Sequence, residues 1–281
     1  PDEVAAVRRR HVAQVIRTGK TIHFEDVRSG RFFSHYLFPV MDPGLKVRRI
    51  AVFGQDITKY RRAEETLKKQ NDLLTSVRHA QSAFMSGQDS RQAYEEMLHT
   101  LVEMTGSEYG FLDEVLYEPD GTPYKLSLAL SDISWDEASR ALYGQLAAQK
   151  LEFRNLNNLS GAPVLEGRLI LANDVPRHPW YRGLPKAHPR LTTYLGIPLY
   201  FGGDIVGVVG VANREGGYTG EMAEFVKPLI QACSAMIWAG RLARREKESV
   251  AALKASEEKY RRIAETANEG IWSIDAQHCT T

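Results

Sequence analysis

Cysteine is nearly absent from this chain of 281 residues, which also lacks an excess of charge of either sign. Only Cys233 and Cys279 occur, with no C-x-x-C pair, so the sequence indicates neither a disulfide framework nor a structural zinc site, and a reducing, cytoplasmic location fits best. The 36 lysines and arginines balance 35 aspartates and glutamates, which leaves no net field to attract a polyanion. We therefore expect no nucleic-acid partner.

Long apolar runs are absent as well. The most apolar stretch, 195–212, is interrupted by Gly202-Gly203-Asp204 and so predicts a strand hairpin rather than a membrane span. The chain begins with Pro1 and has no signal-peptide pattern, so we interpret it as a piece of a longer polypeptide, with any membrane anchor outside this piece. Its 43% hydrophobic and 25% charged residues are typical of a folded globular protein.

The pattern over residues 1–57 predicts one helix followed by an antiparallel meander. Apolar positions at helical spacing suit a helix over 4–17, which Thr18-Gly19 would end. β-Branched and aromatic residues, separated by turn sequences, predict strands over 20–28, 31–40 and 47–55.

Two long helical linkers are predicted, over 58–86 and 244–262. The first carries a repeat of seven residues on two seams, which are Tyr60, Leu67, Leu74 and Gln81, and Ala63, Gln70, Val77 and Phe84. Such a repeat is typical of a coiled coil and favours a homodimer; the alternative is one amphipathic helix lying on a domain. In the second linker, fewer apolar residues recur at this seven-residue spacing. The pairs Arg61-Arg62 and Arg244-Arg245 are interpreted as solvated helix faces.

Residues 87–243 predict a compact α+β domain. Its expected elements are a helix capped by Asp89 and running to Met104, strands over 109–116 and 124–130, a helix from Ser134 to Gln149, a strand over 168–172, a hairpin over 194–213, and an unbroken helix from Gly220 to about 268. The irregular region 151–189 carries aromatic residues among prolines, which favours an ordered, functional loop.

Both flanks of this domain resemble PAS sensory domains. Phe53, Asp56-Ile57-Thr58, Ala63-Glu64 and Leu67 are similar to the end of a PAS domain and its outgoing signalling helix. The segment 23–33 is similar to the second half of such a domain, whereas 256–263 and 268–272 resemble the beginning of another. The resemblance implies the C-terminal part of one PAS domain at 1–57 and the start of a second at 263–281.

The central region resembles a GAF domain. The resemblance is carried by G-I-P-L-Y-F-G-G-D-I-V-G-V-V-G-V-A-N-R-E-G-G-Y-T at 196–219 and by A-N-D-V at 172–175. It implies an antiparallel sheet with helices on one face and a ligand pocket beneath loops on the other. The order PAS, GAF, PAS is similar to the input regions of bacterial sensor histidine kinases and of cyclic-di-GMP signalling proteins, although no output motif of either class occurs in this piece.

Departures from the family patterns disfavour several ligand classes. Bilin-carrying relatives attach their pigment to a cysteine near the loop that corresponds to 186–189. No cysteine occurs in this loop, which argues against covalent bilin and leaves the cofactor unknown. Asn213, Arg214 and Tyr218 match the cyclic-nucleotide pattern only in part, so that ligand is left open but is not favoured. The free-methionine-sulfoxide reductases of this fold rely on pocket cysteines, which are missing here, so no catalytic residue is assigned.

Six residues are candidates for binding a ligand: Phe111, Asp174, Trp180, Tyr181, His188 and Tyr194. The aromatic ones would line an apolar pocket, and the alternative is that they anchor loops on the core. Asp174 and His188, taken with His178, match no spacing typical of a metal site, so no metal is predicted and loop hydrogen bonds are favoured.

Asp56 and Thr58 are candidates for coupling a signal. They stand at a predicted junction between a strand and a helix, where either side chain can cap the helix and tie it to the sheet. The PAS resemblance gives this element the same role.

These features predict a non-catalytic sensory input module. A small molecule or partner bound in the GAF or PAS domains would be relayed through dimeric helices to a downstream output domain of the same polypeptide, with a sensor histidine kinase favoured. A diguanylate cyclase output is one alternative, and a ligand-free dimerisation scaffold is another.

Overall fold

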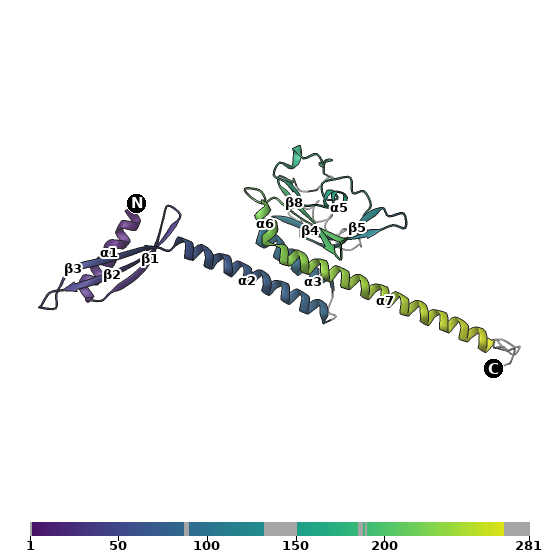
Figure 1. Ribbon diagram of the computed structural model, residues 1–281, viewed down its shortest axis with the longest axis horizontal. Helices are drawn as coiled ribbons and strands as arrows, with labels where there is room; N and C mark the ends of the chain where they lie inside the picture. Colours follow the sequence, from purple (N-terminus) through teal and green to yellow (C-terminus); the bar gives the residue numbers. More distant parts are fainter. Residues whose placement is uncertain (1, 87–89, 132–150, 185–187, 189, 267–281) are drawn as a thin grey trace. The chain divides into compact units, whose positions relative to one another are not determined.

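The computed structural model describes residues 2–86, 90–131, 151–184, 188 and 190–266 (Figure 1). The chain divides into two compact units, Pro1–Asp72 and Leu73–Thr281. The division falls inside the helix α2 (Thr58–Met85), so the first half of this helix belongs to one unit and its second half to the other.

The N-terminal unit is a helix packed on a three-stranded antiparallel sheet of order β1-β2-β3. Its elements are α1 (Asp2–Thr18), β1 (Ile22–Arg28), β2 (Arg31–Met41) and β3 (Val47–Asp56). Val15 of α1 and Leu37 of β2 are buried between helix and sheet. The helix and the strands predicted from the sequence are confirmed, with ends that differ by at most two residues.

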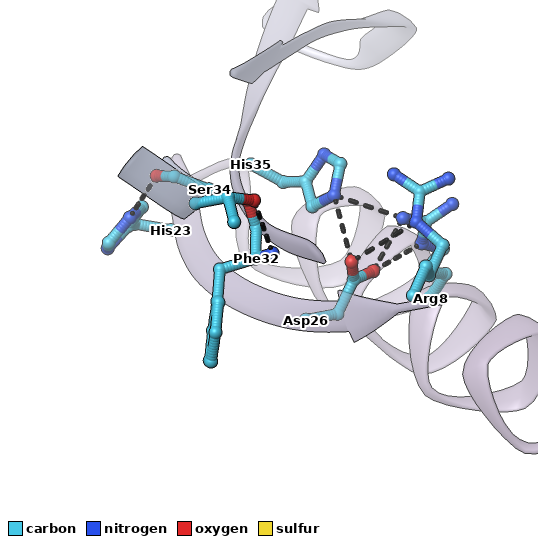
Figure 2. A network of polar contacts seen from close by, with 8 residues as sticks. Arg8, His23, Asp26, Phe32, Ser34 and His35 are labelled. Atoms are coloured by element: carbon cyan, nitrogen blue, oxygen red, sulfur yellow. Dashed lines mark hydrogen bonds and ion pairs between the residues drawn. The ribbon is translucent and has the colours of Figure 1, made fainter. Parts of the chain in front are cut away.

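A polar network holds α1 against this sheet (Figure 2). Arg8 donates to the Asp26 carboxylate through Nε at 2.9 Å, and its Nη2 lies 3.0 Å from His35 Nε2. His35 Nε2 also lies 3.4 Å from Asp26 Oδ1. Burial alone would raise the pKa of Asp26, but hydrogen bonds and charge from Arg8, and then from His35, lower it below its ordinary value. The carboxylate is therefore held in its ionised form.

The second unit is built on a six-stranded antiparallel sheet of order β6-β5-β4-β9-β8-β7. The strands are β4 (Tyr109–Tyr117), β5 (Pro123–Leu130), β6 (Glu152–Phe153), β7 (Ile170–Ala172), β8 (Tyr194–Phe201) and β9 (Asp204–Ala212). β8 and β9 form the predicted hairpin, which turns at Gly202 and Gly203, both with positive φ. β6 is a short edge strand that the sequence did not predict.

Helices cover one face of this sheet, where α3 (Ser90–Thr105) and α7 (Lys227–Thr266) lie together (Figure 1). Side chains of α2, α3 and α7 share one apolar core with the strands: Leu73, Val77, Ala80, Met97, Leu101, Leu112, Val209, Leu229, Met236 and Ile237. The segment between β6 and β8 carries two short helices, α5 (Ala162–Glu166) and the 3₁₀ turn η1 (Val175–Arg177). Within the described residues, no helix is both long enough and apolar enough to span a bilayer.

The unbroken helix predicted from Gly220 is wrong. α6 (Gly220–Phe225) stops before Val226, and α7 starts anew at Lys227. Pro228 accounts for the break, because it has no N–H to donate to the preceding turn but is tolerated in a first helical turn. The predicted helix from Ser134 to Gln149, the Asp89 cap and the strand expected after Gly270 lie outside the described residues.

The second half of α2 lies on a domain, which was the alternative to a coiled coil for its heptad repeat. Leu73, Val77 and Ala80 are buried in the core of the second unit, and Phe84 packs at its edge. Only Val77 and Phe84 belong to a predicted seam, whereas Leu67 and Leu74 of the other seam are exposed. This half of α2 is thus an amphipathic helix lying on a domain.

A buried ion pair fastens α7 to the sheet. The Glu114 side chain of β4 is fully buried and accepts from Arg241 Nε at 3.0 Å and from Arg244 Nη2 at 2.5 Å. Arg241 also donates to the carbonyl oxygens of Val115 and Val206. The expectation that Arg244 belongs to a purely solvated face is corrected by this contact.

We expect Arg241→Ala to lower the free energy of unfolding by about 3–5 kcal/mol, because it leaves a buried carboxylate without its main partner. Arg244→Ala is the matched control, since Arg244 contacts the same carboxylate but has a side chain that is 44% exposed, and it should cost less than about 1 kcal/mol. Urea unfolding followed by circular dichroism measures both. Equal losses would contradict the assignment of Arg241 as the anchor.

Candidate functional site

A cavity of about 280 Å³ opens on the sheet face opposite the helices. Strands β4, β5, β8 and β9 contribute to its wall, together with the segment 151–160 and the residues His188 and Leu191. Most of the lining side chains are apolar or aromatic: Tyr109, Phe111, Leu130, Leu151, Phe153, Leu159, Leu191, Tyr194, Val211 and Ala212. Its size and lining are typical of a site for a small molecule.

Two glycines make room for the aromatic part of the wall. Gly210 of β9 lies between Phe111 of β4 and Gly196 of β8 in the sheet register. A Cβ atom at Gly210 would come 2.3 Å from the Phe111 ring, and one at Gly196 would come 2.5 Å from Tyr194 Oη. Both rings can therefore lie flat over the strands only because these positions lack side chains.

A buried ion pair lies in the wall of the cavity. Lys125 Nζ of β5 is 2.8 Å from Asp113 Oδ2 of β4, and both side chains are only 3% exposed. The ammonium also donates to Ser160 Oγ at 3.2 Å and lies 4.6 Å and 5.2 Å from the ring centroids of Phe111 and Phe153. The carboxylate and the two rings thus compensate the lysine charge in a desolvated place.

The Tyr194 hydroxyl is a buried polar group that has no hydrogen-bond partner among the described residues. The residue is 3% exposed and lines the cavity. Burial, and to a lesser degree the charge of Asp113, raises the pKa of this phenol far above its ordinary value, so the hydroxyl keeps its proton. An unsatisfied buried hydroxyl is unfavourable by about 1–3 kcal/mol. The Tyr194 hydroxyl lies beside Gly196, which is not part of the cavity wall.

The cavity brings together three of the six predicted ligand-binding residues. Phe111, His188 and Tyr194 line it, with His188 at its exposed part. Trp180 and Tyr181 instead pack against the buried cluster around Val175, and Trp180 Nε1 donates to Glu166. These two residues act as loop anchors, which was the alternative for the aromatic set.

Asp174 lies away from the cavity wall. Its side chain is 54% exposed and pairs with Arg177 at 3.5 Å, three residues along the chain. It stands before η1 without capping it through its side chain. Among the described residues, no group of three or more His, Cys, Asp and Glu side chains could hold a metal ion.

Asp113 and Lys125 were not among the residues predicted from the sequence. The signal available there was the pair of adjacent acids, Asp113 and Glu114, in one mainly apolar strand and Lys125 in the next. Asp113 follows Leu112, which faces the helices, and strand alternation then turns Asp113 toward the loops. Their pairing depends on the register of β4 and β5, which places Val115 opposite Lys125. That register could not be read from composition.

Hydrogen bonds of Asp56 and Thr58 connect the sheet of the N-terminal unit to the helix α2. Asp56 Oδ1 accepts from the Thr58 N–H at 2.9 Å, and hydrogen bonds from Thr58 lower the pKa of Asp56. The Thr58 hydroxyl accepts from the Phe32 N–H at 2.9 Å, and the Ile57 N–H donates to the Phe32 carbonyl. Arg61, which was expected on a solvated face, pairs with Glu25 of β1. The first turn of α2 is therefore tied to both β1 and β2.

Cys233 lies on the opposite side of the sheet from the cavity. It is buried in α7 among the helix-side core residues, and burial raises the pKa of its thiol to about 12. A thiol with that pKa and no access to the cavity is a poor nucleophile. Cys279 lies outside the described residues.

A sheet with helices on one face and a cavity beneath loops on the other defines an α+β domain with an internal pocket. The sequence model of the GAF domain family matches residues 87–237, which is more than half of the chain, so the chain belongs to the GAF domain family. GAF domains are typically regulatory sensing domains, and this domain is consistent with a sensory module.

A curated relative is named a sensor. The methyl sulfide methyltransferase-associated sensor of Methanosarcina acetivorans is 27% identical over 180 residues, which make up 64% of this chain but only 17% of that protein. The chain thus spans less than a fifth of this relative.

A solved structure has the same fold. The GAF domain of a phosphoenolpyruvate-protein phosphotransferase from Coxiella burnetii is 19% identical, with a TM-score of 0.50, over 63% of this chain and 98% of that one. The corresponding domain from Acinetobacter is 12% identical, with a TM-score of 0.46, over 62% and 97%. The first likeness shows the fold alone.

We expect Tyr194→Phe to leave the free energy of unfolding unchanged or to raise it by up to about 1 kcal/mol, because it removes an unsatisfied buried hydroxyl. Tyr218→Phe is the matched comparison. Tyr218 is 2% exposed, but its hydroxyl bonds Ser107 Oγ at 2.7 Å, so its loss should lower stability by about 1 kcal/mol. Thermal and urea unfolding measure both variants. A loss at Tyr194 as large as at Tyr218 would show that the Tyr194 hydroxyl has a partner.

Lys125→Met should lower the free energy of unfolding by about 3–5 kcal/mol, since it leaves Asp113 buried and unpaired. Combining it with Asp113→Leu should restore most of that loss, because both buried charges are then gone. Arg154→Met is the control at an exposed pair, with a side chain 61% exposed, and should change stability by less than about 1 kcal/mol. Urea unfolding of the four proteins tests this, and a double variant no better than Lys125→Met would refute the pairing.

Proposed function

We propose that this chain is a sensory input region of a signal-transduction protein, in which the GAF cavity binds a small molecule and helices carry the effect to an output domain. A sensor histidine kinase is the favoured output and a diguanylate cyclase the second. Support comes from the GAF family, from a relative named a sensor, and from the cavity itself. The flanking PAS parts, at 1–57 and 263–281, belong to this proposal.

One observation carries the proposal: consecutive residues of β4 serve the cavity and the outgoing helix. Asp113 faces the cavity and pairs with Lys125, while Glu114 faces the other way and pairs with Arg241 and Arg244 of α7. A ligand that shifts β4 at Asp113 would shift the anchor of α7 at Glu114. The ligand needs to prefer only one of two positions of this strand to change the population of helix arrangements.

The proposed relay requires a homodimer. Apolar side chains are exposed along the part of α7 that extends beyond the core, at Leu242, Val250, Leu253, Tyr260 and Ile263. In the first half of α2, Tyr60 and Leu67 are exposed in the same way. Exposed apolar residues along a helix favour pairing with a second helix, and a parallel pair of α7 helices would bury them.

The second candidate function is a ligand-free dimerisation scaffold. The exposed residues of α7 favour it as much as they favour the sensor. A scaffold does not need a cavity of about 280 Å³ with a buried, unpartnered hydroxyl, and an interior without function is normally close-packed. The cavity therefore favours the sensor.

Native mass spectrometry of the full chain, purified gently from the cells that express it, should detect a dimer carrying an additional small-molecule mass. Ser127→Phe, at the half-buried cavity wall, should remove that mass, because the new ring occupies the site. Thr122→Phe, at the exposed β4–β5 turn, is the control and should retain it. A bare dimer would favour the scaffold, and a bare monomer would rule out the relay through paired helices.

A further inference from the structure

The two faces of the N-terminal sheet have different neighbours. On one face, His11 of α1 stacks on Phe24 of β1, and Arg8 of α1 bonds Asp26. Successive side chains of a strand point to opposite faces, so the residues between these lie on the face away from α1. His23 and Ser34, which are bonded to each other in Figure 2, belong to this second face. We call it the open face.

The open face carries apolar side chains that are exposed to solvent. Five of them are between 38% and 55% exposed: Val27, Tyr36, Phe38, Val40 and Phe53. The ring of Tyr36 stacks on His23 at 4.4 Å and on Phe38 at 6.0 Å. Three aromatic and two valine side chains, each about half exposed, present about 400 Å² of apolar surface. Exposed apolar patches of this size often mark interaction sites.

The area of the open face is close to what a stable dimer needs. A non-obligate interface is about 57% apolar, so about 400 Å² of apolar surface corresponds to about 700 Å² in total on each partner. Specific protein interfaces bury about 600–1,000 Å² on each partner. The sheet alone is therefore large enough to hold two copies of the chain together.

The strand register makes the aromatic part of this face self-complementary. His23 of β1 lies opposite Tyr36 of β2, which in turn lies opposite Phe53 of β3, so one row of three rings crosses the sheet. In a symmetric dimer, a two-fold axis along β2 turns such a row onto itself. Phe53 then meets His23 of the second copy, and the two Tyr36 rings meet at the axis.

The next row on the same face is polar, and it is self-complementary too. It consists of Glu25, Ser34 and Gln55, one residue from each strand. The same axis sets the Gln55 amide against Glu25 of the second copy. Glu25 already accepts from Arg61, but a carboxylate has about four acceptor sites and can take the amide N–H as well. A second copy thus satisfies both rows of the open face.

We propose that the open face is a homodimer interface, at which the sheets of two copies pack face to face around a two-fold axis along β2. Aligned sheets that pack in this way lie about 10 Å apart. The axis brings both α2 helices out at the same end of the paired sheets, as a parallel pair of helices requires. The proposal goes beyond the proposed function, because it uses neither the cavity nor the exposed residues of α7.

Sedimentation equilibrium of the full chain tests the interface. Phe53→Asp should raise the dissociation constant of the dimer by about 30-fold or more, since it sets a carboxylate in the middle of the apolar contact. Val52→Asp is the matched control. Val52 is the preceding residue, is 63% exposed and lies on the sheet face toward α1, so the constant should stay within about twofold. Circular dichroism should show both variants folded, because both side chains are exposed.

Two substitutions at Gln55 test the arrangement of the copies. Gln55→Glu should raise the dissociation constant by about fivefold or more, because it sets a second carboxylate against Glu25 of the other copy. Gln55→Lys should lower the constant or leave it unchanged, because it sets a cation there. A weaker dimer from both substitutions would overturn the two-fold axis along β2.

The outcome for this interface is separable from that for the proposed relay. If Phe53→Asp and Val52→Asp change the dissociation constant equally, the sheet interface is rejected, and the pairing of α7 stands as long as the chain is a dimer. If the unaltered chain is a monomer at every concentration, both the sheet interface and the paired helices are rejected.

Discussion

The second unit depends on the pairing of two buried acids that follow each other in β4. Asp113 and Glu114 are both desolvated, and an unpaired carboxylate in either place would be strongly unfavourable. Strand geometry sends their side chains to opposite faces, so each needs a cation from a different part of the fold. Lys125 meets this need from β5, and Arg241 from α7. The cavity wall and the outgoing helix are thereby fixed to the same strand.

This arrangement also explains why the two faces of the sheet differ. The helix face is filled mainly by apolar side chains such as Leu112, Leu229 and Ile237, and Glu114 pairs there with Arg241. On the loop face, the rings of Phe111 and Tyr194 lie over the glycines at 196 and 210, and both residues form part of the cavity wall. Close-packed interiors transmit displacement, whereas a cavity yields to its occupant. The loop side of the sheet can thus adjust to an occupant of the cavity, whereas the helix side is close-packed and rigid.

Periodicity and turn chemistry were sufficient to predict most strands and the hairpin of β8 and β9, because those features depend on neighbours in sequence. The GAF motif over 196–219 was sufficient for the fold class. The break at Val226 was available from Pro228 but was outweighed by the long apolar repeat around it. Neither the Asp113–Lys125 pair nor the Glu114–Arg241 pair could be predicted, since each joins residues that only the folded register brings together. Of the six candidate ligand residues, three lie on the cavity wall, because aromatic type alone does not distinguish a pocket wall from a loop anchor.

A relay of the proposed kind needs helices that are anchored on the sheets, and each half of α2 is anchored in its own unit. Its first turn is bonded to the N-terminal sheet through Thr58 and Phe32, and its second half is buried in the GAF core through Leu73, Val77 and Ala80. Between these anchors the helix contains neither glycine nor proline, the residues that most readily interrupt a helix. Within the second unit, Leu73, Val77 and Ala80 pack in the same core as Leu112, the residue of β4 immediately before Asp113. The second half of α2 and the cavity therefore bear on one strand.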